Sequence, residues 1–117
     1  MPEPTYRVLF HLDEADRAKH ESVLRNIRNL LDDLGADKTQ VELVTHGQGL
    51  DLLTGQTDQG ERVRELIEQG VTVAACNNTL RERHIPAERL LPGVTIVSSG
   101  VGELVRREAE GWLYVRP

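Results

Sequence analysis

The sequence is poor in cysteine and in aromatic residues: its 117 residues include one Cys, one Trp, one Phe and two Tyr. The single thiol, Cys76, cannot form an internal disulfide, and neither a CxxC motif nor a paired Cys/His zinc spacing is present. Any redox chemistry would therefore need a second thiol from a partner or a neighbouring subunit. With so few aromatic rings, the core must be built from Leu, Val, Ile and Ala.

Two further absences narrow the class of protein. The N-terminus, Met1-Pro2-Glu3-Pro4, lacks the basic segment of a signal peptide, and the apolar run after it is too short to span a membrane. The net charge of -5 disfavours non-specific nucleic-acid binding, which depends on neutralising phosphates. We therefore expect a cytoplasmic protein that binds neither nucleic acid nor membranes and folds as one domain over residues 1–117.

Short apolar segments alternate with longer amphipathic segments along the chain. Strands are predicted at residues 5–12, 40–45, 71–76, 94–97 and 112–116. Helices are predicted at residues 14–34, 58–69 and 102–110, with shorter helical turns at 79–83 and 85–91. This alternation predicts the α/β class, as a three-layer α/β/α sandwich in which a five-stranded, mainly parallel sheet lies between two helix layers.

Capping residues locate the helix ends. Asp13 is expected to cap the first helix, and Asp58 and Glu61 have the spacing of a capping box at the start of the second. Gly35 and Gly70 are expected to end these two helices, because glycine readily adopts the left-handed conformation found after a helix.

The hydrophobic pattern predicts which side chains are buried. The strand at 40–45 interrupts its apolar residues with Glu42, so it should be less covered than the first strand. In the helix at 102–110, Leu104 and Val105 should face inward and Arg106 and Arg107 outward.

The segment 47–55 is predicted to be a loop by its glycines, yet it carries Leu50, Leu52 and Leu53. Three leucines in so short a loop are too apolar to stay in water. They should pack on the sheet or on another subunit.

Cys76 is the first candidate for a functional atom, because its strand should end at the thiol. Asn78 can cap the short helix that follows, which begins with Thr79, so the sulfur should lie at a helix N-terminus. The unpaired N–H groups there, with Arg81 and Arg83 nearby, would favour a thiolate over a thiol. The alternative is that Cys76 is a small buried hydrophobe.

In an open α/β sheet, ligands bind beyond the carboxyl ends of the strands. Those ends carry His11 and His46 as well as Cys76. A neutral imidazole could accept the thiol proton, the three residues could bind a metal, or each histidine could only hydrogen-bond to nearby backbone. His20 and His84 are expected on the surface, without a function.

The turn 98–102 contains Ser99 and Gly100 ahead of a helix, and its free N–H groups could hold an anion. A dinucleotide fingerprint and a Walker lysine motif are both absent, which disfavours NAD and ATP. Without a G-x-S-x-G motif, neither Ser98 nor Ser99 is expected to be a nucleophile.

Several stretches together resemble the DsrE/DsrF-like family, closest to its stand-alone members. The resemblance covers nearly the whole chain and rests on these segments: Phe10-His11-Leu12-Asp13-Glu14, Leu24-Arg25-Asn26-Ile27-Arg28-Asn29-Leu30-Leu31, His46-Gly47-Gln48-Gly49-Leu50, Ala75-Cys76-Asn77-Asn78-Thr79-Leu80, Pro92-Gly93-Val94, Ser99-Gly100-Val101-Gly102-Glu103-Leu104-Val105 and Gly111-Trp112.

The resemblance implies the strand order 4-3-2-1-5 and a homo-oligomer, usually a trimer or hexamer, in which the apolar loop around Leu50 could be covered. Better-studied members of the family carry sulfur as a cysteine persulfide, and Cys76 resembles the cysteine that does so. The resemblance therefore implies a sulfur relay.

Three hypotheses follow. The first is a sulfur carrier without a cofactor, in which Cys76 takes sulfur from a thiol-bearing protein donor and passes it to an acceptor. The second is a non-enzymatic oligomeric module that binds a small anion or a partner protein, and the third is a metal site at His11, His46 and Cys76. The residues expected to support the site are Asn78, Thr79, Arg81, His11, His46, Ser99 and Gly100.

Overall fold

The computed structural model describes residues 4–55 and 57–117. Strands and helices alternate as the sequence predicts. Their bounds are β1 Tyr6–Leu12, α1 Arg17–Leu34, β2 Thr39–Thr45, η1 Gly47–Leu53, α2 Gly60–Glu68, β3 Thr72–Cys76, α3 Asn77–Glu82, η2 Ala87–Arg89, β4 Thr95–Val97, α4 Gly100–Ala109 and β5 Leu113–Val115, where η1 and η2 are 3₁₀ helices.

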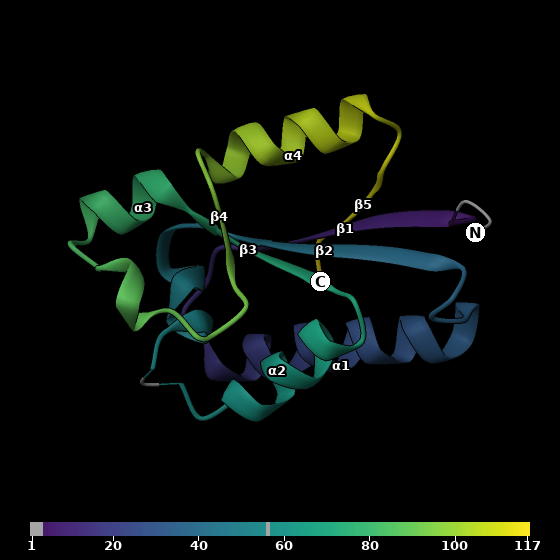
Figure 1. Ribbon diagram of the computed structural model, residues 1–117, viewed down its shortest axis with the longest axis horizontal. Helices are drawn as coiled ribbons and strands as arrows, with labels where there is room; N and C mark the ends of the chain where they lie inside the picture. Colours follow the sequence, from purple (N-terminus) through teal and green to yellow (C-terminus); the bar gives the residue numbers. More distant parts are fainter. Residues whose placement is uncertain (1–3, 56) are drawn as a thin grey trace.

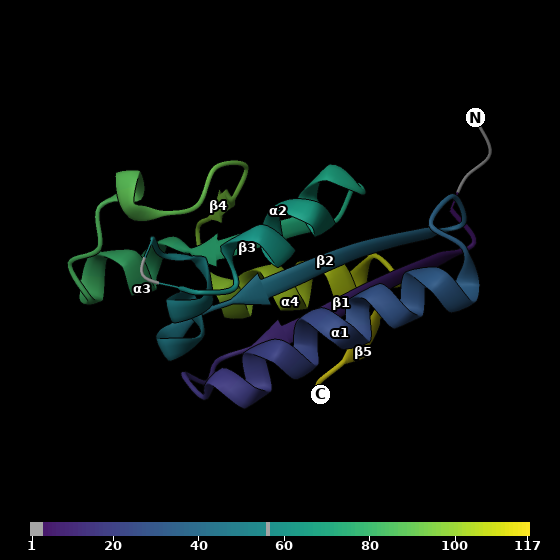
Figure 2. The same cartoon turned by 90° about the horizontal axis from the view of Figure 1, so that it is seen from below.

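The five strands form one sheet in the order β4-β3-β2-β1-β5, and every neighbouring pair is parallel. Helices α1 and α2 cover one face of this sheet and α4 covers the other (Figure 1). The view from below, onto the face that these two helices cover, shows α1 and α2 beside each other across the sheet (Figure 2). The predicted three-layer fold and strand order are confirmed, and no helix of the described residues is long and apolar enough to cross a membrane.

Alternation along β1 divides the core in two. Val8 and Phe10 belong to the larger apolar cluster, which the sheet forms with α1 and α2. Leu9 points the other way and joins Leu104 and Trp112 in a smaller cluster under α4. Both faces of the central strands are therefore buried, as expected of a parallel sheet between two helix layers.

The apolar segment 47–53 is a 3₁₀ helix that packs inside its own chain. Leu50, Leu52 and Leu53 are each 0% exposed and belong to the larger core cluster. The packing is close, because a Cβ on Gly49 would lie 2.3 Å from the carbonyl oxygen of Leu12. These leucines need no other subunit to cover them, so the suggestion that an oligomer buries them is wrong.

Two helix starts differ from the prediction. Asp16, not Asp13, caps α1 by accepting a hydrogen bond from the N–H of Ala18 at 3.1 Å. Helix α2 begins at Gly60 without a side-chain cap, and Asp58 accepts hydrogen bonds from Arg17 of α1 instead. Local sequence spacing does not reveal a distant partner such as Arg17, which competes with the helix end for the carboxylate of Asp58.

The predicted faces of β2 and α4 are also partly wrong. β2 is buried at every position except Gln40, and Glu42 is only 1% exposed. Arg107 turns inward to reach Glu42 with 2.8 Å between Nε and Oε1, whereas Val105, predicted to face inward, is 63% exposed. A hydrogen bond between α4 and the sheet therefore turns Arg107 inward, whereas hydrophobicity alone assigned the inward position to Val105.

Candidate functional site

Cys76 is the last residue of β3, and α3 begins at the next residue. The residue is 5% exposed, and it pairs with Val97 of β4 in the parallel ladder. Ala74 lies two residues earlier on β3, so its side chain points to the same face of the sheet as Cys76, and it packs in the smaller cluster under α4. The thiol therefore lies at the carboxyl edge of the sheet, on the α4 face, where the sequence placed it.

Hydrogen-bond donors surround the sulfur. Burial by itself would raise the pKa of the Cys76 thiol, but hydrogen bonding of the thiolate to the Thr79 hydroxyl and to the backbone N–H groups of Gly100, Thr79 and Asn78, which lie beside the sulfur, lowers the pKa below that of a free thiol. Such bonds favour the charged form because a thiolate accepts them more strongly than a thiol does. The lowered pKa thus arises from converging donors rather than from exposure to water.

Thr79 connects this sulfur to the end of β2. Its Oγ1 accepts a hydrogen bond from the N–H of Gly47 at 2.9 Å, which leaves the hydroxyl hydrogen free to donate to Cys76. Gly47 has φ +55°, and it is the first residue of η1. The turn after β2 therefore orients the Thr79 hydroxyl, the side-chain donor next to the thiol.

Arg81 and Arg83, the cations expected near Cys76, bind other side chains. Arg81 donates to the side-chain oxygen of Asn78 at 3.0 Å, and Arg83 pairs with Asp51 at 2.7 Å. Asn78 also lies inside α3 and is not its cap, since α3 begins at Asn77. The prediction that Asn78 caps this helix is wrong: β3 runs straight into the helix, so Cys76 itself occupies the capping position.

The turn before α4 contacts both Cys76 and His46. Ser99 caps α4, with its Oγ accepting from the N–H of Gly102 at 3.0 Å, so the helix begins two residues earlier than predicted. A Cβ on Gly100 would lie 2.9 Å from the Cβ of His46. Glycine is thus required for the close approach that brings the Gly100 N–H to the sulfur. The N–H groups of Gly100 and Gly102, predicted to hold an anion, are already bound within the chain.

His11 and His46 meet at the same edge of the sheet. Their Nε2 atoms are 2.7 Å apart, and the rings stack with centroids 4.8 Å apart. Nδ1 of His11 lies 2.6 Å from the hydroxyl of Tyr114 and 3.2 Å from a guanidinium nitrogen of Arg116. Because arginine only donates, Nδ1 of neutral His11 accepts, and Nε2 carries the proton that it donates to His46.

The surroundings of His11 disfavour its charged form. Burial and the charge of His46 lower the pKa of His11, and Arg116 acts in the same direction, whereas Asp13 opposes them. His11 is therefore suited to remain a neutral ring in a hydrogen-bonded chain.

The only described group with the spacing of a metal site is His11, Asp13 and His46, whose ligand atoms lie within 4.8 Å of one another. Cys76 is not part of this group, so the predicted set of His11, His46 and Cys76 is not brought together as metal ligands. Arg116 already binds Asp13 at 2.9 Å and places a positive charge beside the imidazoles, which disfavours a cation there.

Sequence reasoning missed Tyr114, Arg116 and the role of Asp13. Strand β5 lies beside β1, with Val115 opposite Phe10, so the residues that flank Val115 along the chain come next to His11. The signal that could have found them is the strand order, since it places the C-terminal strand against the first. His20 was also misjudged, because it is buried and its Nε2 lies 2.5 Å from the carbonyl oxygen of Glu14; His84 is on the surface, as predicted.

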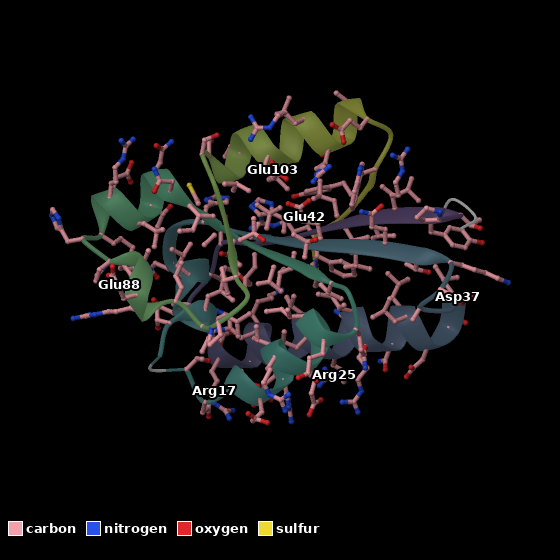
Figure 3. The ribbon with its side chains drawn as sticks, viewed as in Figure 1. Arg17, Arg25, Asp37, Glu42, Glu88 and Glu103 are labelled. Carbon is pink, nitrogen blue, oxygen red and sulfur yellow. The ribbon has the colours of Figure 1, made fainter. Side chains whose placement is uncertain are left out.

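A second polar cluster lies between the sheet and α4, where Glu42 and Glu103 approach each other (Figure 3). Burial and a hydrogen bond to Glu103 raise the pKa of Glu42 to about 7, although Arg107 opposes the shift. Oε2 of Glu42 has no hydrogen-bond donor among the described residues. A proton on Glu42 satisfies this oxygen and leaves Glu103 as the charged partner of Arg107, in accord with the lowered pKa of Glu103, whose largest cause is that same hydrogen bond.

Comparisons with known proteins place this site in a family. The sequence matches the model of the DsrE/DsrF-like family over residues 7–117. It is 44% identical to the protein of unknown function MTH1491 from Methanobacterium thermoautotrophicum, whose solved structure superposes with a TM-score of 0.92 and covers 96% of this chain and 99% of that one. A search of curated proteins gave no match.

Two more distant structures share the fold. The ychN protein from E. coli is 18% identical, with a TM-score of 0.81 over 96% of this chain and 99% of that chain. The conserved protein of unknown function BT1422 from Bacteroides thetaiotaomicron is 15% identical, with a TM-score of 0.76 over 95% of this chain and 94% of that chain.

Proposed function

Because this chain belongs to the DsrE/DsrF-like family, we propose that it is a sulfur-relay protein that holds sulfane sulfur as a persulfide on Cys76. The observation that carries the proposal is the set of donors on the sulfur, formed by the Thr79 hydroxyl and the N–H groups of Gly100, Thr79 and Asn78. They stabilise the thiolate, which is the nucleophilic form of cysteine.

The proposed reaction is an exchange that needs no oxidant. The Cys76 thiolate attacks the outer sulfur of a donor persulfide, R–S–SH, so that one S–S bond forms and another breaks. The products are Cys76–S–SH and the donor thiolate, which takes up a proton from water. An acceptor thiolate then removes the outer sulfur in the same way and regenerates the Cys76 thiolate. Donor and acceptor are thiol-bearing proteins, and a reducing compartment such as the cytoplasm would keep Cys76 available.

Access to the sulfur is part of the proposal. Since Cys76 is 5% exposed, transfer needs a local opening, and the element expected to move is the first turn of α4, which begins at Gly100 beside the sulfur.

The test is incubation with a persulfide donor, followed by intact-mass analysis of the protein. We expect the wild type to gain the mass of one sulfur atom, which an added thiol then removes, and Cys76→Ser to gain none. Absence of sulfur on the wild type, or equal addition to Cys76→Ser, would refute the proposal.

A second candidate function is a non-enzymatic oligomeric module that binds a small anion or a partner protein. The low exposure of Cys76 favours it, since a sealed thiol performs no chemistry. Such a protein should tolerate Cys76→Ser with its binding unchanged.

We also propose that the protein is a homo-oligomer, a trimer or hexamer. Support comes from large apolar side chains that are exposed on α4 and on both edge strands: Ile96, Val101, Val105, Leu113, Tyr114 and Val115. Light scattering coupled to size-exclusion chromatography tests this, and a monomer at micromolar concentration would contradict it.

A further inference from the structure

A groove between α1 and α2 concentrates positive charge on a protein whose net charge is -5. Arg25 and Arg28 of α1 and Arg62 of α2 line it, and Glu65 is its only acidic residue. Three guanidinium groups against one carboxylate leave a local charge of about +2. The charge of this groove is therefore opposite in sign to that of the whole chain.

These three arginines also lack partners within the described part of the chain. Arg25, Arg28 and Arg62 make no ion pair and no side-chain hydrogen bond with any described residue. In contrast, Arg17 and Arg64 on the same two helices bind carboxylates. Glu21, Glu61 and Glu68 of these helices thus pair with the arginines outside the groove and not with those inside it.

The groove is large enough for a small ligand such as an inorganic anion. Its volume is about 260 Å³, and its lining includes Leu24 and Leu66, which are both buried in the core. Two amide side chains, Asn29 and Gln69, add neutral hydrogen-bonding groups. Arg25 and Arg28 are three residues apart, so they lie on one face of α1. The three arginines are exposed, so their guanidinium groups are free to turn toward a ligand in the groove. Guanidinium groups with amides beside them suit a tetrahedral oxyanion, which accepts paired hydrogen bonds from arginine.

We propose that the α1/α2 groove binds a small oxyanion with two negative charges, such as a phosphate group. Two negative charges match the local charge, and the volume leaves room for a compact organic part on the same ligand. The groove lies on the face of the sheet opposite α4 and Cys76, and Figure 3 shows Arg25 on this side and Glu103 on the other. The site is therefore separate from the proposed sulfur chemistry.

The test is isothermal titration of the full chain with inorganic phosphate, and separately with pyrophosphate and sulfate, at constant ionic strength. We expect saturable binding of one anion per chain. The double variant Arg25→Gln/Arg62→Gln should weaken binding at least tenfold, which is about 1.4 kcal/mol. The double variant Arg17→Gln/Arg64→Gln is the matched control, because it removes two positive charges, one from each helix, outside the groove.

The outcomes separate the explanations. No saturable binding of any of the three anions at millimolar concentrations would overturn the proposal. Equal weakening by Arg17→Gln/Arg64→Gln would also overturn it, since the effect would then come from overall charge. Stronger binding of pyrophosphate than of phosphate would indicate a ligand with two phosphate groups. Cys76→Ser should bind the anion as the wild type does, so this test is independent of the sulfur relay.

Discussion

The Thr79 hydroxyl accepts a hydrogen bond from the N–H of Gly47 at 2.9 Å and lowers the pKa of Cys76, for whose thiolate it can serve as a donor. One side chain thus ties the turn after β2 to the thiol at the end of β3. The pKa of Cys76 therefore depends on a contact between two neighbouring strand ends, and not on α3 alone.

Thr79→Val removes this hydroxyl while keeping the shape of the side chain. We expect the pKa of Cys76 to rise, because the thiolate loses its side-chain donor. Stability should fall by about 1–3 kcal/mol, since the N–H of Gly47 also loses its acceptor. Alkylation rates as a function of pH measure the first effect and urea unfolding the second. Thr79→Ser keeps the hydroxyl and is the control; an unchanged pKa in Thr79→Val would contradict the role of Thr79.

Gly100→Ala tests the close approach of α4 to His46. The new Cβ would lie 2.9 Å from the Cβ of His46, so the start of α4 and His46 must move apart, which disturbs the Gly100 N–H beside Cys76. We expect a loss of about 1–3 kcal/mol in stability and a higher pKa of the thiol. Gly60→Ala is the control, because its Cβ meets only a leucine methyl at 3.6 Å. Equal behaviour of the two variants in thermal unfolding and alkylation would argue against the contact.

Glu42 should make stability depend on pH near neutrality. Its pKa is raised from 4.5 to about 7 in the folded protein, so the folded state binds the proton more tightly than the unfolded state. The stability from this proton is fully present below pH 4.5 and is lost as the pH rises through about 7.

Glu42→Gln mimics the protonated carboxyl and should remove this dependence. Between pH 5 and pH 8, the wild type should lose about 1–3 kcal/mol of stability relative to Glu42→Gln. The difference between the two proteins is the quantity to measure by urea unfolding, because the lowered pKa of His11 acts in both and makes stability fall at low pH instead. Parallel pH profiles would show that Glu42 is ionised throughout this range.

Leu52→Ala tests whether the 3₁₀ helix belongs to the core of its own chain. Leu52 is 0% exposed, so removing its side chain should cost about 2–5 kcal/mol. The cost should not depend on protein concentration, since no other subunit covers the residue. Lys38→Ala is the control: its side chain is exposed and lies outside the apolar surface, so it should change stability by less than about 0.5 kcal/mol. A concentration-dependent midpoint for Leu52→Ala alone would place the leucine at an interface.

The sequence was sufficient to predict the strands, the helices and their layers, because the hydrophobic period and the positions of glycines depend only on residues close together in the chain. The apolar centre of β1 and the stop at Gly35, which has φ +95°, depend on a few neighbouring residues. The strand order came from resemblance to a family and not from periodicity. The site was partly predictable, since the thiol and two histidines follow strand ends.

What the sequence could not predict depends on contacts between distant residues. Arg107 faces inward because it donates a hydrogen bond to Glu42, which lies 65 positions earlier in the chain, on β2 of the sheet. Tyr114 and Arg116 reach His11 only because β5 pairs with β1. Likewise, the donors on Cys76 come from α3 and from the start of α4, so their convergence is a property of the fold.

The most direct test of the account is to titrate Cys76 in the wild-type protein by measuring its alkylation rate as a function of pH. Cys76→Ser, which has no thiol, gives the background rate. The account predicts a reactive thiol whose rate rises with a midpoint below the value of about 8.5 for free cysteine. A midpoint at or above that value, or a thiol that stays inert until the protein unfolds, would contradict it.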